Sequence, residues 1–177
     1  WDKIRLMGCM GNIKICVLAL MIVLMRACTS TEPAKKSVPE KVNPAAPETS
    51  SIAPAVERDV LYYINQHRES KGLASLSFNA IVANEARKHS TDMASRRVAF
   101  GHQGLTSRTK NITAKIKTVN AVSENVARGS LTAQQAVNLW LKSPGHRKNI
   151  EGKFKYTGIG VARDRKSELY FTQIFAN

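Results

Sequence analysis

Three side chains in the second half of the sequence, His102, Glu124 and His146, have the chemistry of ligand binding and proton transfer. A neutral imidazole can bind a divalent ion such as zinc, or act as a general base. Two His and one Glu form a three-ligand set that leaves one coordination position open for water, and such a water can attack an ester or an amide. None of the three lies one helical turn from another, so separate elements must bring them together.

The same three side chains could also serve in two ways that involve no catalysis. The three side chains could line a cleft that binds a ligand, or they could form a buried hydrogen-bond network that only stabilises the fold. A serine nucleophile at Ser123 or Ser143 is disfavoured, because neither lies in the strained strand-to-helix turn that hydrolases use. We therefore expect binding or a structural role rather than catalysis, and no required cofactor. A divalent metal such as zinc stays open as an alternative.

The spacing of apolar residues and the turn residues between them predict the elements that carry these side chains. We expect helices over residues 56–71, 78–97, 132–142 and 146–150, with a short additional helix near 105–110. The last of the long helices is followed by Ser143-Pro144, which are a preferred N-cap and a preferred first helical residue. We expect strands at 121–127, 156–162 and 169–176, with the last two joined as a hairpin by residues 163–167. Helices first and a hairpin last predict an α+β fold.

Several short motifs, in one order along the domain, resemble the CAP superfamily, also called SCP (cysteine-rich secretory, antigen and pathogenesis-related proteins), and in particular its disulfide-free bacterial branch. The resemblance covers residues 60–175. It rests on Asn65-x-x-Arg68, Gly101-His102, Glu124-Asn125-Val126-Ala127, Trp140-x-x-Ser143-Pro144-Gly145-His146-Arg147-x-Asn149, Gly158-Ile159-Gly160-Val161 and Tyr170-Phe171-Thr172-Gln173.

The resemblance implies a three-layer α-β-α sandwich with a small, mainly antiparallel sheet. It also implies a surface cleft, where eukaryotic members bring together two histidines and two acids. His102 matches the first histidine and Glu124 the first acid, but Ser143 stands at the second acid and Tyr170 at the second histidine. His146 and Arg147 belong to the bacterial motif, and we expect all six of these residues at the cleft.

The first 28 residues have the pattern of an export signal. Basic residues precede a short apolar run at 15–25, which is the order found in secretory signals. The run is shorter than the roughly 20 apolar residues that span a bilayer. Cys28 follows it closely and resembles the lipidated cysteine of bacterial lipoproteins, although Arg26 departs from that pattern. We expect a lipid anchor on Cys28, with ordinary signal cleavage as the alternative.

The remaining sequence divides into a tether and a domain. Residues 29–54 are rich in Ser, Pro, Ala and Thr, a composition that cannot bury enough surface to fold. Residues 55–177 contain no cysteine, so this domain must be stabilised by packing without disulfides. The domain carries 20 Lys and Arg against 9 Asp and Glu, and a charge of that size attracts polyanions.

We therefore expect a monomeric extracytoplasmic protein, anchored at the cell surface or on the periplasmic face of a membrane, or else secreted. Its partners would be an anionic lipid, a glycan or cell-wall polymer, or a host molecule, and we expect no nucleic acid as a partner. A metal-assisted hydrolase using His102, Glu124 and His146 is one alternative function. A structural or host-interaction protein with a vestigial cleft is the other.

Overall fold

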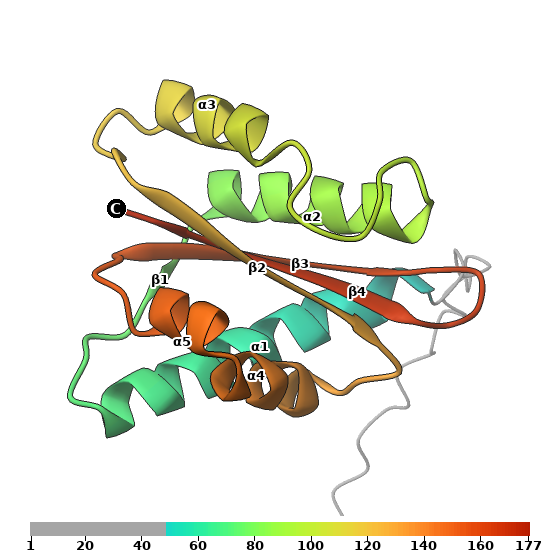
Figure 1. Cartoon of the computed structure of the whole chain (residues 1–177), viewed down its shortest axis with the longest axis horizontal. Helices are drawn as coiled ribbons and strands as arrows, with labels where there is room; N and C mark the ends of the chain where they lie inside the picture. The colour runs from blue at the N-terminus through green and yellow to red at the C-terminus, as the bar shows by residue number, and fades with distance from the viewer. Residues whose placement is uncertain (1–48) are drawn as a thin grey trace, which may run out of the picture. The chain divides into compact units, whose positions relative to one another are not determined.

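The computed structural model describes residues 49–177, in which a four-stranded sheet lies between two layers of helices (Figure 1). The predicted export signal, Cys28 and most of the predicted tether lie outside these residues. None of the described helices is both long enough and apolar enough to cross a membrane. The predicted α+β fold class is confirmed.

The elements follow the order that the sequence predicts. The five helices are α1 (Thr49–Ser70), α2 (Ala80–Ala94), α3 (Leu105–Lys115), α4 (Ala133–Lys142) and α5 (Pro144–Ile150). The four strands are β1 (Ser77–Phe78), β2 (Val122–Gly129), β3 (Tyr156–Arg163) and β4 (Leu169–Ala176).

Several helix boundaries differ from the prediction, including the end of α2 at Ala94 and the start of α5 at Pro144, and three of the differences have a clear cause. Helix α1 begins before residue 56 and includes Pro54, because Ala53 and Val56 pack against the hydrophobic core and extend the helix. Helix α2 begins two residues later than predicted, because Asn79 caps it by accepting bonds from the amides of Ile81 and Val82. Helix α3 continues beyond residue 110 to Lys115, since Ile112 is fully buried in the second core cluster.

The sheet has the strand order β1-β3-β4-β2, so β2 is an edge strand. Strand β1 pairs with β3 in parallel, whereas β3 and β2 both pair antiparallel with β4. The register places Glu124 opposite Ile174 and Arg128 opposite Tyr170. Sites near Glu124 and near Arg128 therefore lie toward different ends of β2.

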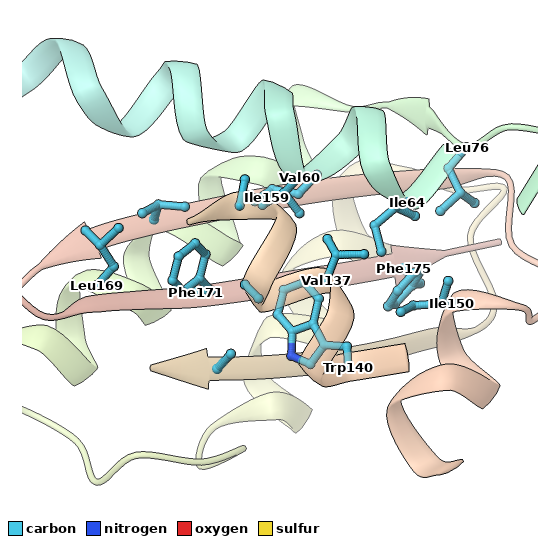
Figure 2. Packing of buried hydrophobic residues seen from close by; sticks show 14 residues of the cluster. Val60, Ile64, Leu76, Val137, Trp140, Ile150, Ile159, Leu169, Phe171 and Phe175 are labelled. Carbon is cyan, nitrogen blue, oxygen red and sulfur yellow. The ribbon is translucent and has the colours of Figure 1, made fainter. Parts of the chain in front are cut away.

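Side chains on the two faces of the sheet form separate core clusters. On the face toward α1 and α4, Phe171 and Phe175 pack with Trp140, and Figure 2 shows these rings among the aliphatic side chains of that cluster. The Trp140 indole is also anchored, because Nε1 donates to the Val126 carbonyl at 3.0 Å. On the opposite face, Ile174 packs with residues of α2 and α3. Figure 1 shows α2 and α3 on one side of the sheet and α1, α4 and α5 on the other.

Helix α2 lies very close to strand β3, and two glycines permit this. A Cβ on Gly158 would lie 2.1 Å from the Ala83 amide nitrogen, and one on Gly160 would lie 2.2 Å from that of Arg87. Real Cβ atoms do not approach backbone so closely, so any side chain at either position would push the helix away. This contact fixes α2, and with it His89, against the sheet.

Candidate functional site

The candidate site is built around the Glu124 carboxylate, whose side chain is fully buried. Arg108 of α3 donates from Nε to Oε2 and from Nη2 to Oε1, both at 2.8 Å. His102 donates from Nδ1 to Oε1 at 2.9 Å. A bidentate guanidinium and an imidazole therefore satisfy both carboxylate oxygens, in the charge-assisted geometry that makes such bonds strong.

The loop before α3 positions His102. Gly101 has φ = 144°, a conformation that a residue with a side chain rarely adopts. The Gly101 carbonyl accepts a bond from Nε2 of His89 at 2.8 Å, and His89 lies buried on α2. At the other end of the loop, Arg108 Nη1 donates to the Gln103 carbonyl at 2.9 Å. The loop is thus tied to α2 and to α3 on either side of His102.

The bond to Glu124 determines how His102 meets solvent. A carboxylate that binds an arginine accepts hydrogen bonds and donates none, so Nδ1 of His102 carries the proton. In the neutral ring Nε2 is then an acceptor, and protonation makes it a donor. The His102 side chain is 48% exposed. A ligand therefore has access to its imidazole, while Glu124 beneath it is out of reach.

His146 approaches the site from the other face of the sheet, across the edge strand β2. Its helix α5 is tied to β2 by Asn125 Nδ2, which donates to the His146 carbonyl at 3.1 Å, and by Asn149 Nδ2, which donates to Asn125 Oδ1 at 2.8 Å. Ser123 adds a 2.6 Å bond from Oγ to Asn149 Oδ1. Glu124 thus binds the loop and α3 on one face of β2. Its neighbours Ser123 and Asn125, which alternate with it along the strand, bind α5 on the other face.

Two histidines here have perturbed acid–base behaviour. Burial lowers the pKa of His146, and the charge of the nearby His102 lowers it further. Burial also lowers the pKa of His89, with a further lowering from Arg108 that opposes the raising effect of the bond to Gly101. His102 thus acts on His146 through its charge, although α5, which carries His146, and α3 lie on opposite faces of the sheet.

The residues present do not fit a zinc site that uses Glu124 as a ligand. Both of its oxygens are already bound by Arg108, and a guanidinium in that position would lie next to the metal and repel it. Within residues 52–177, no group of three or more His, Cys, Asp or Glu side chains could hold a metal ion. Glu124 is instead placed to orient His102, as carboxylates behind ligand histidines do.

The other predicted site residues do not all lie here. Ser143 occupies the N-cap position of α5, but its hydroxyl makes no capping bond. Arg147 lines a separate pocket between α1 and α5, next to the His67–Glu151 ion pair. Tyr170 is buried against Met93 and lies four residues along β4 from the partner of Glu124, which is roughly 13 Å away at the usual rise per residue.

Two members of the site were missed from the sequence, Arg108 and His89. Arg108 is one of many basic residues, but it lies one helical turn before Ile112 on the buried side of α3. A charged residue on an apolar stripe needs a buried partner of opposite charge, and this pattern could have identified it. His89 also lies outside the motifs, and the structure places it buried on α2, where it binds the Gly101 carbonyl.

Comparisons with known proteins identify the family of this chain. The family profile described as CAP, the cysteine-rich secretory protein family, matches residues 61–175. The uncharacterized protein YkwD of Bacillus subtilis is 32% identical over 142 residues, which are 77% of this chain and 52% of that protein.

Solved structures show the same fold. An extracellular protein containing a SCP domain from Bacillus anthracis superposes with a TM-score of 0.64 at 26% identity, over 76% of this chain and 45% of that one. An outer surface protein of Borrelia burgdorferi superposes with a TM-score of 0.60 at 18% identity, over 69% of this chain and 94% of that one. The chain thus spans about half the length of the two Bacillus proteins.

Proposed function

The chain belongs to the cysteine-rich secretory protein (CAP) family, and on that premise we propose that it is an extracytoplasmic binding protein for an anionic ligand. The observation that carries this proposal is unbalanced positive charge. Residues 52–177 contain 20 Lys and Arg against 9 Asp and Glu. Among these residues, only Arg87, Arg97 and Arg108 form ion pairs with carboxylates of the same part of the chain. Apart from Arg68, which is buried against backbone carbonyls, the other cations remain available to an external anion.

The acidic groups, in contrast, are largely engaged. Glu57 and Glu124 are buried and bound by Arg87 and Arg108. Asp92 pairs with Arg97, and Glu151 pairs with His67. Because each arginine–carboxylate pair is neutral, the excess positive charge lies on the exposed Lys and Arg side chains that have no such partner, which favours the capture of a polyanion.

The arrangement at Glu124 favours binding over catalysis. A carboxylate held by a bidentate arginine is a poor general base and a poor metal ligand. What reaches solvent is the imidazole of His102, and its Nε2 can donate a hydrogen bond to a phosphate or carboxylate group when the ring is protonated. We therefore favour a binding cleft over the metal-assisted hydrolase that the same residues suggested.

The test of binding uses the exported protein purified from its own host. We expect saturable binding to immobilised heparin, a sulfated polyanion, with an affinity that falls as salt rises because the contacts are ionic. Neutral dextran serves as the control and should not bind. Absence of heparin binding at low salt, or binding that does not respond to salt, would overturn the proposal.

Replacing His102 and His146 together by Ala separates a binding cleft from a structural network. Weaker heparin binding with an unchanged melting temperature supports the cleft. A large fall in melting temperature would instead assign both residues to stabilisation of the fold, as a protein with a vestigial cleft requires.

We also propose that a lipid on Cys28 attaches the protein to a membrane at the cell surface, with the following segment as a tether. The support is the basic and apolar leader that ends near Cys28. Growth of the producing cells with labelled palmitate tests it. We expect label in the wild-type protein and none in Cys28→Ser, and label that persists in the variant would refute the anchor.

A further inference from the structure

A second hollow, lined by Phe100 and Gln103 but not by His102, lies at the end of the sheet where the β3–β4 hairpin turns. Its volume is about 550 Å³, within the range of small-ligand sites. Its walls come from the end of α2, the loop that follows it, the hairpin, and Arg128 near the end of β2. Its lining includes Arg96, Phe100, Arg128, Lys166 and Tyr170.

The charge of this hollow favours an anion. Its lining includes Arg96, Arg97, Arg128 and Lys166, against Asp164 and Glu168. Asp164 is occupied by the hairpin turn, because its Oδ1 accepts bonds from the amides of Lys166 and Glu168. Arg97 is paired with Asp92. Among the described residues, Arg96, Arg128 and Lys166 form no ion pair, so three unpaired cations outnumber the two carboxylates of the lining.

Arg128 is held in place by an aromatic shelf. Its guanidinium carbon lies 5.2 Å from the centre of the Phe100 ring, a cation–π contact. Phe100 in turn meets Tyr170 edge to face, with ring centres 6.3 Å apart. A guanidinium fixed in this way loses little further freedom on binding, and its planar donors match a phosphate or carboxylate group. The aromatic shelf therefore holds the Arg128 guanidinium in an orientation in which it can donate hydrogen bonds to an anion.

Phe100 itself remains 43% exposed, although it is a large apolar ring. Exposed aromatic rings beside hydrogen-bonding groups suit the flat, C–H-rich face of a sugar. The other apolar residues of the lining include Met93 and Tyr170, which are buried, and the small Ala99, so the exposed apolar surface is centred on one aromatic ring. The combination of one exposed ring with three unpaired cations fits an anionic saccharide better than a lipid.

The backbone at Arg96 is a second sign of specialisation. Arg96 has φ = 58° and follows the C-cap residue Ser95 at the end of α2. Glycine is the favoured residue at this position, because any side chain is strained there. The chain has arginine instead, and the side chain lines the hollow. A strained residue at a concave surface is a typical mark of a functional position.

We propose that this hollow binds an anionic saccharide unit, with Arg128, Arg96 and Lys166 contacting its phosphate or carboxylate group and Phe100 contacting its ring. This inference rests on the proposed function and specifies both a place and a ligand class for it. The site differs from the His102 cleft in position and in residues.

The test compares two double variants that remove the same charge. Arg128→Gln with Lys166→Gln alters the hollow, and Lys110→Gln with Lys115→Gln alters exposed positions on α3. The probes are polygalacturonate, which carries carboxylates, a phosphomannan, which carries phosphates, and phosphatidylglycerol vesicles. We expect the hollow variant to lose about tenfold in affinity for at least one saccharide, the effect of losing about one charge-assisted contact. The control should lose less than about twofold from its surface charges.

The outcomes separate the two proposals. If the wild type binds a saccharide and both double variants weaken it equally, the hollow is not the site, although the proposed function stands. If the wild type binds neither saccharide nor heparin, the proposed function fails as well. Binding to vesicles alone would replace the saccharide by a lipid headgroup and overturn the inference.

Two single variants check the parts of the site. Phe100→Leu keeps an apolar side chain but removes the ring, and we expect weaker saccharide binding at an unchanged melting temperature. Arg96→Gly removes a cation and relieves the backbone strain at φ = 58°, so it should bind more weakly while melting no lower than the wild type. Unchanged binding in both variants would exclude the hollow.

Discussion

Replacement of Arg108 by Met would test whether the centre of the candidate site depends on a buried charge pair. Met fills much of the same space without charge. The change removes two bonds to Glu124, each 2.8 Å long, and one bond to the Gln103 carbonyl. It leaves a fully buried carboxylate with His102 as its remaining close partner.

Breaking a buried pair by removing one partner costs about 3–5 kcal/mol, because the other charge stays buried without compensation. For a domain of this size, a loss of about 4 kcal/mol lowers the melting temperature by roughly 15 °C. Adding Glu124→Gln to Arg108→Met removes the uncompensated charge. We therefore expect the double variant to be more stable than Arg108→Met alone, by about 2 kcal/mol.

Urea unfolding followed by far-ultraviolet circular dichroism measures all three free energies. The dependence of the free energy on urea should stay the same, so that shifts in midpoint report stability. A loss below about 1 kcal/mol in Arg108→Met would mean that Arg108 does not compensate Glu124. A double variant no more stable than the single one would mean that the carboxylate is not the source of the cost.

Two further predictions concern the elements that support the site. Burial is the main cause of the lowered pKa of His89, so the unfolded chain binds more protons than the folded one as pH falls below about 6.5. Stability should therefore fall between pH 7.5 and 5.5, and less steeply in His89→Gln; equal slopes in urea unfolding would contradict this. Gly160→Ala places a Cβ 2.2 Å from the Arg87 amide nitrogen and should lower the free energy of unfolding by about 3 kcal/mol or more. The control Gly145→Ala has nothing within 4 Å of its Cβ and should not lower it. Equal melting temperatures of the two variants would refute the close approach of α2 to β3.

The fold could be predicted largely because its signals are local. Apolar spacing identified the long helices, and the hairpin strand β4 was predicted with its observed bounds, Leu169–Ala176. The motif Asn65-x-x-Arg68, one of those that carry the family resemblance, ties the first helix to the segment that follows it. Asn65 exchanges two bonds with the Leu76 backbone, and Arg68 donates to the carbonyls of Ala74 and Ile150. The start of α1 was less predictable, because the tertiary contacts of Ala53 and Val56 decide it.

The site could be predicted only in part, because its contacts join residues far apart in sequence. The contact between His102 and Glu124 spans 22 positions, and the motifs around each residue marked them without giving the distance. Arg108 carries no comparable motif, so its bond to Glu124 was missed. Tyr170 was expected at the cleft because of its position in a motif. The register instead places it opposite Arg128, beside the second hollow.

The arginine at the centre explains how one site can be both buried and compatible with an anionic ligand. A bare Glu124 beneath His102 would repel an incoming phosphate or carboxylate, whereas the Glu124–Arg108 pair is electrically neutral. The field at the mouth of the cleft is then set by His102, His146 and the surface cations rather than by the acid. The second hollow reaches a positive balance in another way, because its three unpaired cations outnumber the carboxylates of Asp164 and Glu168. The hairpin amides hold Asp164 in the turn, whereas the charge of Glu124 is cancelled by Arg108.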